Sequence, residues 1–176
     1  GIAVANRSTS ASVAVQALAA DGARTQTGYA YDGARDPYEL VLDHVVDRAV
    51  QHSVDLIGAS KPASATVDLV LDPHLAATVI GLVAGTLTGD RVLKGRSPFA
   101  NRVGEQVASP LLTLVDDATN PASLGADSTD GEGLATRRVP LVVDGVLQGF
   151  LHDSYTGRRS GVGSTGSAVR GIRGLP

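Results

Sequence analysis

The positions of helix-breaking residues confine long helices to the first 90 residues of this chain. Residues 36–54 and the apolar segment from Asp72 onward each begin with Asp-Pro and then run on without a further proline. Aspartate caps a helix and proline fits its first turn, so both segments are predicted helices. After Asp90, glycine and proline recur so often that no long helix is predicted.

Strand patterns lie on both sides of these helices. Residues 10–31 alternate apolar with small or polar side chains, and Asp21-Gly22 provides a hairpin turn between two strands. Further strands are predicted at residues 65–71 and 111–117, and a second hairpin at residues 137–155 turns at Asp144-Gly145.

These elements predict an α+β fold with a boundary near Ser109-Pro110. Residues 1–108 form a mixed α/β part of sheet and helices, and residues 109–176 form a β-rich part. The chain has no methionine and opens abruptly in an apolar alternation. We therefore interpret it as a fragment of a longer two-domain protein. On that interpretation, the first part ends one domain and the second part begins the next.

The composition excludes several classes of function. The net charge is −3 and the pI is near 5.7, so the basic face that a direct nucleic-acid binder needs is not expected. No apolar run reaches the roughly 18–20 residues of a membrane span. Cysteine is absent, which excludes disulfides, thiol nucleophiles and cysteine metal ligands from this chain.

The four histidines do not follow a recognisable catalytic or metal-binding pattern. His44 and His52 are eight residues apart on a predicted helix, where metal-binding pairs favour a spacing of four. His74 lies at the start of the second helix, and His152 lies beside an aspartate without a nucleophile nearby. The G-x-G-x-x-G string at residues 161–166 lacks a following helix pattern and acid, so no nucleotide site is predicted.

Several short polar strings occur in a fixed order between residues 95 and 170. They are S-P-F, V-G-E-x-V, a strand ending in D-D, E-G-x-x-T-R-R, D-G-V-L-x-G-F-L-x-D-S-Y and S-T-G. This order strongly resembles the TldD/PmbA family, whose members are also called modulators of DNA gyrase. The first half resembles the family more loosely, through "ANRST" near the start and "DPHLAATVIGLVAG".

The resemblance implies a longer protein and an assembly. In this family, a TldD-like subunit and a PmbA-like (TldE) subunit pair to form a cytoplasmic zinc protease. It degrades unfolded or flexible peptides and trims leader segments from peptide precursors. The expected partners are therefore a TldD-like metalloprotease subunit and such peptides, with no direct nucleic acid and no membrane. Self-association is a further option.

The resemblance also assigns a metal motif that this chain lacks. Active TldD-like subunits carry H-E-x-x-x-H on the helix before the "GD" string, where the histidines bind zinc and the glutamate acts as general base. Counting back from Gly89-Asp90, those three positions are Ile80, Gly81 and Gly85. None of them can bind zinc or transfer a proton. We therefore expect no catalytic residue and no metal in this chain, and zinc in a TldD-like partner.

Polar members of the matched strings are the candidate peptide- or partner-binding residues. They are Asp116, Asp117, Glu132, Arg137, Asp153, Ser154 and Thr165. Structural roles are the alternative for each residue. The two consecutive aspartates end a predicted strand, where Asx turns are common, and Glu132 could pair with Arg137 across a loop.

Three functions are compatible with these features. The first is a non-catalytic PmbA/TldE-like subunit that serves peptide degradation and precursor maturation. The second is a self-sufficient metallopeptidase that gathers the histidines with acids into an unrecognised site. The third is a modulator of DNA gyrase that acts by protein contact.

Overall fold

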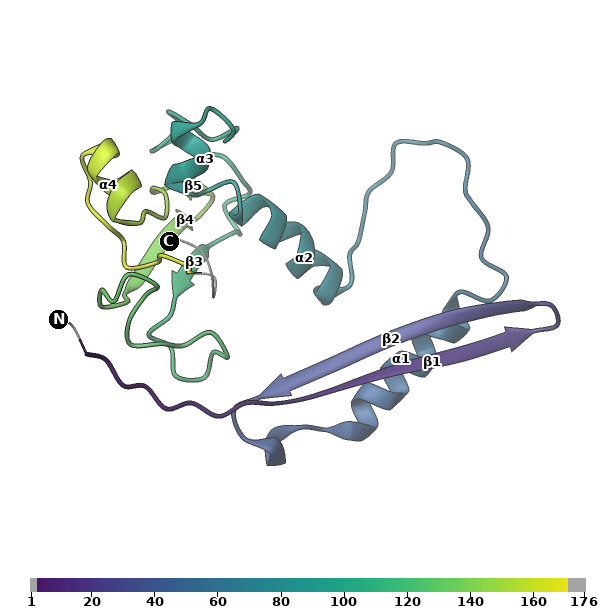
Figure 1. The fold of residues 1–176 in the computed structure, drawn as a ribbon. Helices are drawn as coiled ribbons and strands as arrows, with labels where there is room; N and C mark the ends of the chain where they lie inside the picture. The colour runs from purple at the N-terminus through teal and green to yellow at the C-terminus, as the bar shows by residue number, and fades with distance from the viewer. Residues whose placement is uncertain (1–2, 171–176) are drawn as a thin grey trace. The chain divides into compact units, whose positions relative to one another are not determined.

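The protein has an α+β fold in the computed structural model, which describes residues 3–170 (Figure 1). These residues form two compact units. The hairpin unit comprises residues 7–68, and the sheet unit comprises residues 3–6 and 69–170. Each unit has its own small hydrophobic core.

The hairpin unit consists of two long strands and one helix. Strands β1 (Ala11–Asp21) and β2 (Arg24–Ala34) pair antiparallel along their whole length, and the tight turn between them contains Gly22 at a φ of 61°. The predicted hairpin is therefore confirmed. Helix α1 (Leu42–Asp55) packs on one face of it, as Figure 1 shows.

A small set of residues forms the core between α1 and the hairpin. Its buried members are Ala30, Val45 and Ala49, with Val13, Val15 and Ala17 around them. Gly28 of β2 lies directly under α1, because a Cβ added there would collide with the backbone of Ala49 and Ser53. Val45 and Ala49 are the buried apolar side chains that α1 turns toward the hairpin.

The predicted helix over residues 36–54 is interrupted near its start. Asp36 does cap, accepting a hydrogen bond of 2.9 Å from the backbone of Tyr38, but the turn it begins is only a 3-10 helix, η1 (Pro37–Glu39). Leu40 then takes extended backbone angles, φ −73° and ψ 124°. One extended residue breaks the α-helical hydrogen-bond ladder, so the α-helix begins only at Leu42.

The predicted strand at residues 65–71 is wrong for this structure. The segment has no regular secondary structure, and Val67, Leu69 and Val70 are 72%, 74% and 95% exposed. A strand needs a partner for its backbone ladder, and no strand among residues 3–170 pairs with this segment. An alternating pattern alone therefore did not make a strand here.

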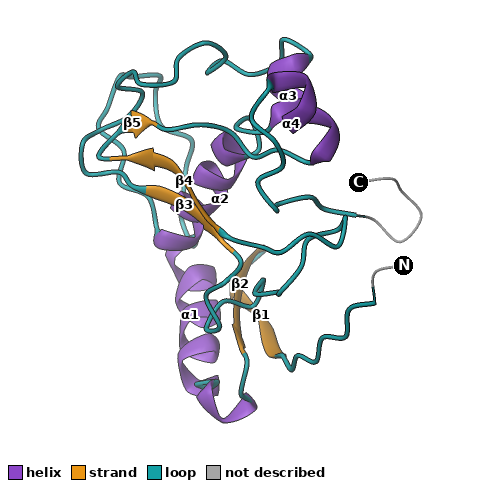
Figure 2. Cartoon of the chain, turned by 90° about the vertical axis from the view of Figure 1, so that its left-hand side faces the viewer, coloured by secondary structure: helices purple, strands orange, loops and turns teal. Residues whose placement is uncertain are grey.

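The sheet unit combines a small sheet with three helices (Figure 2). The strands form an antiparallel sheet in the order β3-β4-β5. The elements in chain order are α2 (Pro73–Ala84), α3 (Gly89–Leu93), β3 (Leu114–Asp117), β4 (Arg138–Val143), β5 (Val146–Leu147) and α4 (Ser154–Ser160). The core gathers four buried residues: Leu87, Leu141, Val142 and Leu147.

Two local predictions in this unit are confirmed. Asp72 caps α2 by accepting a 2.9 Å hydrogen bond from the backbone of His74. Asp144 and Gly145 form the turn between β4 and β5 with φ of 48° and 78°. The strands themselves are shorter than predicted, and α4 replaces the end of the second hairpin from Ser154 onward.

The predicted boundary near Ser109-Pro110 lies inside the sheet unit. The backbone of Val107 donates to Gly145, and Gly145 donates in turn to Leu112, each at 2.9 Å. These bonds tie the chain on both sides of residue 109 to the same turn, and the compact units divide at residues 68 and 69 instead. The assignment of residues 1–108 and 109–176 to two domains of a longer protein stays a prediction.

Within residues 3–170, every helix is too short or too polar to cross a membrane.

Two glycine substitutions should have opposite effects on stability. Gly28→Ala should destabilise the hairpin unit by about 1–3 kcal/mol, because the new methyl group collides with α1. Gly81→Ala should stabilise α2 by roughly 0.5–1 kcal/mol, because no atom lies within 4 Å of the added carbon. Peptide-resolved hydrogen exchange measures each unit separately. Equal effects of the two changes would contradict this packing.

Candidate functional site

The start of α4 gathers three of the candidate residues. The Asp153 carboxylate caps the helix, accepting from the Thr156 backbone at 2.6 Å and from its hydroxyl at 2.7 Å. The Glu132 carboxylate accepts from the backbone and hydroxyl of Ser154 at 2.8 and 2.7 Å. Both carboxylates thus satisfy free donors of the first turn, where negative charge is favourable.

The S-T-G string closes over this helix start from its other side. The Thr165 hydroxyl accepts from the backbone N–H of His152 at 2.8 Å and donates to the carbonyl of the same residue at 3.0 Å. The backbone N–H of Thr165 donates to that carbonyl as well, at 2.9 Å. The Arg137 guanidinium donates to the carbonyl of Ser164 at 3.0 Å. Glu132 and Arg137 therefore bind separate partners and do not form the pair considered from the sequence.

The two aspartates at the end of β3 have different partners. Asp116 accepts a 2.8 Å hydrogen bond from the Ser167 hydroxyl, which links β3 to the segment after the S-T-G string. Asp117 accepts from the backbone and hydroxyl of Thr119 and lies 3.7 Å from the Arg138 guanidinium. The structure thus brings six of the seven candidates into connected contacts, and Asp117 forms a local turn.

His152 is a buried member of this network, as is Thr156. Its side chain is 5% exposed, and its Nδ1 lies 3.3 Å from the Thr156 hydroxyl. Gly89 makes room for the ring, because a Cβ at that position would collide with Nδ1. Burial lowers the pKa of His152, and the nearby Asp153 carboxylate opposes that shift. The imidazole is therefore favoured in its neutral form.

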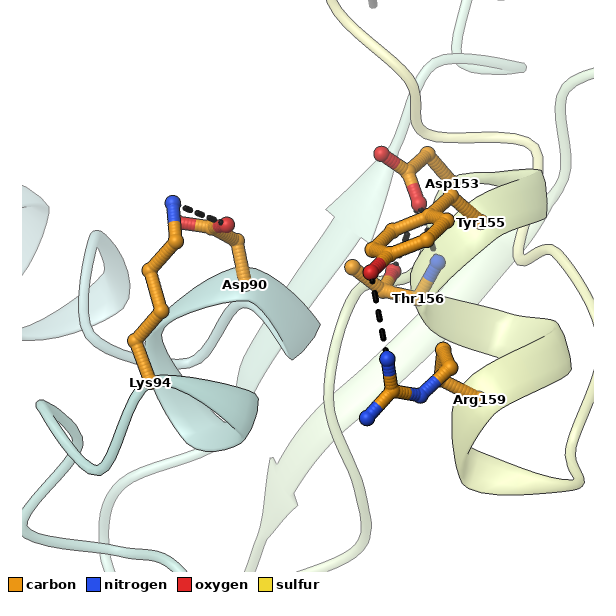
Figure 3. Close-up of polar contacts among 6 residues, drawn as sticks. All are labelled: Asp90, Lys94, Asp153, Tyr155, Thr156 and Arg159. Atoms are coloured by element: carbon orange, nitrogen blue, oxygen red, sulfur yellow. Dashed lines mark hydrogen bonds and ion pairs between the residues drawn. The ribbon is translucent and has the colours of Figure 1, made fainter.

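A cleft lies between α3, α4 and the segment after the S-T-G string. It has a volume of about 250 Å³ and is lined by Thr88–Asp90, Leu151, Asp153, Thr156 and Ser167–Val169. Figure 3 shows polar contacts on the two helices beside it: Asp90 pairs with Lys94 at 2.7 Å on α3, and the Arg159 guanidinium donates to the Tyr155 hydroxyl on α4 at 3.2 Å. The cleft itself is lined by both apolar and polar groups, and its carboxylates, Asp90 and Asp153, already have partners.

A second cleft shares the Ser167–Val169 wall with the first. Its volume is about 420 Å³, and Asp116, Asp127, Asp130 and Gly131 are among its lining residues. Asp130 is a functional candidate that the sequence did not single out. It accepts from the backbones of Glu132 and Leu134 at 2.9 Å and of Ala168 at 3.2 Å. The bond from Ala168 spans 38 residues and had no local signal in the sequence.

Helix α2 presents an apolar surface at the three positions compared from the sequence with the H-E-x-x-x-H motif. Ile80 lines an apolar cavity of about 100 Å³ with Val83, Leu87 and Phe99. Gly81 faces open space, and a Cβ at Gly85 would meet only helix carbonyls, the nearer at 3.4 Å. These residues provide no ligand, and the cavity beside them suits hydrocarbon.

The other histidines are dispersed. His44 is exposed on α1, the His52 ring lies 3.0 Å from the Tyr29 carbonyl, and His74 begins α2. Within the described part of the chain, no three histidine or acidic side chains are arranged to hold a metal ion. The contacts of the site instead hold backbone and hydroxyl groups in place. Among the described residues, no set of side chains could bind a metal ion that activates water.

The sequence matches a known protein family over most of its length. Residues 64–176 fit the profile described as the PmbA/TldA metallopeptidase C-terminal domain. A metalloprotease from Methanothermobacter thermautotrophicus is 30% identical over 167 residues, which cover 92% of this chain and 37% of that protein.

Solved structures share the fold. TldE from Thermococcus kodakarensis is 28% identical, with a TM-score of 0.74. The match covers 93% of this chain and 37% of the TldE chain. A Thermotoga maritima protein named for modulation of a DNA gyrase is also 28% identical, with a TM-score of 0.76 and coverages of 91% and 37%. The chain thus spans little more than a third of the length of these relatives.

Acid should destabilise this network, because folding disfavours protonation of His152. The folded-state pKa lies below the usual value of 6.5, so the unfolded chain binds the proton more readily. The contribution of neutral His152 to the unfolding free energy is therefore fully present above pH 6.5. It is lost as the pH falls from that value through the lowered folded-state pKa. Urea unfolding between pH 5 and 8 measures this. His152→Gln should flatten the pH dependence, whereas His44→Gln on exposed α1 should leave it unchanged.

The hydroxyl of Thr165 should matter more than its methyl group. Thr165→Ala removes both bonds that the hydroxyl makes with His152 and should cost about 1–3 kcal/mol of unfolding free energy, because a part-buried N–H loses its acceptor. Thr165→Ser keeps the hydroxyl and should recover most of that loss. Urea titration compares the two variants, and equal losses would show that the methyl group, not the hydroxyl, stabilises this contact.

Proposed function

Because this chain belongs to the PmbA/TldD metallopeptidase family, we propose that it is a non-catalytic, PmbA/TldE-like subunit. It pairs with a zinc-bearing TldD-like subunit in the cytoplasm and takes part in peptide degradation and precursor maturation. The zinc belongs to that partner. The resemblance to a solved TldE structure supports this assignment.

The observation that carries the proposal is the chemistry of α2. The helix keeps the Asp-Pro start and leads into Gly89-Asp90, as the resemblance requires. Ile80, Gly81 and Gly85 stand at the three positions of the H-E-x-x-x-H motif, and Ile80 lines an apolar cavity. A cavity of this kind would disfavour a hydrated metal ion, because charge is costly to move into apolar surroundings.

The two clefts beside Ser167–Val169 are the proposed peptide-binding surface. They carry Asp116 and Asp153 on either side of one extended wall segment. An extended peptide binds largely through backbone hydrogen bonds, which suits flexible substrates of low sequence preference. The α4 network would serve to keep this wall in place.

Reconstitution with a TldD-like subunit tests the proposal. We expect an unstructured peptide to be cleaved only when the TldD-like subunit is present, and chelation to abolish the cleavage. This chain alone should cleave nothing at any zinc concentration. Metal-dependent cleavage by this chain alone would contradict the proposal and favour a self-sufficient metallopeptidase.

A matched pair of variants locates the peptide. Asp116→Asn changes the cleft wall, and we expect it to raise KM for the peptide in the reconstituted pair. Asp43→Asn removes the same charge from the exposed side of α1 and should change nothing. If the two variants behaved alike, the peptide would not lie in this cleft.

The gyrase-related name of the Thermotoga maritima relative motivates one further assay. Purified chain added to DNA gyrase should leave supercoiling unchanged under the proposed function. A dose-dependent change would favour a modulator that acts by protein contact.

A further inference from the structure

An apolar cavity lies in the sheet unit between α2, the loop segments around Phe99 and residues 107–112, and the strands β3 and β4. Its volume is about 100 Å³, and among the described residues only valine, leucine, isoleucine, alanine and phenylalanine line it. The inner wall includes Leu87 and Val142, which are 1% and 4% exposed and belong to the hydrophobic core. This side of the cavity is therefore formed by packed residues.

The outer side of the cavity is formed by exposed residues of α2. Val79 and Val83 are about one helical turn apart and are each 43% exposed, and Ile80 beside them is 38% exposed. None of the 12 residues of α2 is buried. The cavity thus opens among apolar side chains that solvent reaches, and a group that entered it would cover part of that apolar surface as well.

The backbone of the loop wall offers few free groups to water. The N–H groups of Val107 and Ala108 donate to the Gly145 carbonyl at 2.9 and 3.2 Å, and Gly145 donates to the Leu112 carbonyl at 2.9 Å. The Ala108 carbonyl accepts from the Gln106 side chain at 2.6 Å. The cavity has the volume of about three waters, but a buried water needs roughly two to four polar partners. Water is therefore a poor occupant here.

The size and chemistry of the cavity favour a small hydrocarbon group. An apolar cavity of roughly 150 Å³ in another protein stays dry and binds benzene, so about 100 Å³ suits a somewhat smaller group. The branched side chain of leucine is such a group and has no polar atom. A peptide that carried it would also cross the exposed rim formed by Val79, Ile80 and Val83.

We propose that this cavity binds one branched aliphatic side chain, such as leucine, of an unfolded peptide. Unfolded chains expose such side chains, whereas folded proteins bury most of them, so the cavity would select for unfolded peptides. The identity of the occupant rests on the proposed function, in which this chain takes part in peptide degradation. The apolar character of the cavity does not rest on it.

An NMR titration of the purified chain with two peptides tests the proposal. Both peptides are short and unstructured, and they differ only in a central leucine or asparagine, whose side chains have similar shapes. The leucine peptide should shift the amide signals of the cavity wall, such as those of Val83 and Ala108. It should bind at least about tenfold more tightly than the asparagine peptide, because only leucine gains from burial in an apolar site.

Two matched pairs of variants locate the side chain. Ala108→Leu fills the cavity and should abolish the preference for leucine, whereas Ala77→Leu makes the same change on exposed α2 outside the cavity and should keep it. Val83→Asp needs no room in the cavity and places a carboxylate at its rim. It should weaken binding of the leucine peptide about tenfold, whereas Leu82→Asp, at a 72% exposed position outside the cavity, should not.

Equal affinity for the two peptides would overturn the proposal, as would a leucine preference that Ala108→Leu and Val83→Asp both retain. If benzene shifted the signals of the cavity wall and the leucine peptide did not, the cavity would be a site for free hydrocarbons, which also overturns the proposal. Failure here is distinct from failure of the proposed function. A reconstituted pair that cleaves both peptides equally well would sustain that function and contradict only this inference.

Discussion

The backbone pairing between the end of α2 and the residues before α4 organises the sheet unit. Leu151 donates to the Leu87 carbonyl at 2.9 Å, and Gly89 donates to the Leu151 carbonyl at 2.7 Å. Leu87 is at the centre of the core, and the next residue after Leu151 is the buried His152. One short contact therefore joins the core, the start of α3 and the polar network at α4.

This contact explains why residues from distant strings meet. His152 follows the paired residue, so its backbone is held where Thr165 can bind both its N–H and its carbonyl. Asp153 and Ser154 come next and begin α4, where Glu132 closes the first turn. Gly89 is required because the imidazole occupies the volume that a Cβ would take. The polar strings of the family thus form one connected structure.

Local features of the fold could be predicted because their causes are local. Asp72 caps α2 through a residue two positions away, and Asp144-Gly145 adopts the positive φ values that its residue types favour. The segment at residues 65–71 has the alternation of a strand, but a strand also depends on a partner elsewhere in the chain. Leu40 interrupts the first predicted helix, and the α-helix begins only at Leu42.

The contacts of the candidate residues could not be predicted from the sequence, and their role in binding stays a prediction. The strings that resemble the family singled out Glu132, Asp153, Ser154 and Thr165, because these are polar positions within them. Where a hydrogen bond joins two different strings, its partners are 13 or more residues apart in the sequence. No local sequence pattern predicts such a pairing. Asp130 was missed for the same reason, since its bond to Ala168 spans 38 residues.

The central claim is that α2 retains the position of a metal-binding helix without its chemistry. Zinc analysis of the purified chain, after incubation with excess zinc and removal of unbound metal, tests this most directly. A zinc-bearing TldD-like relative treated in parallel provides the positive control. The account predicts that only the relative retains zinc. Near-stoichiometric zinc on this chain would contradict it.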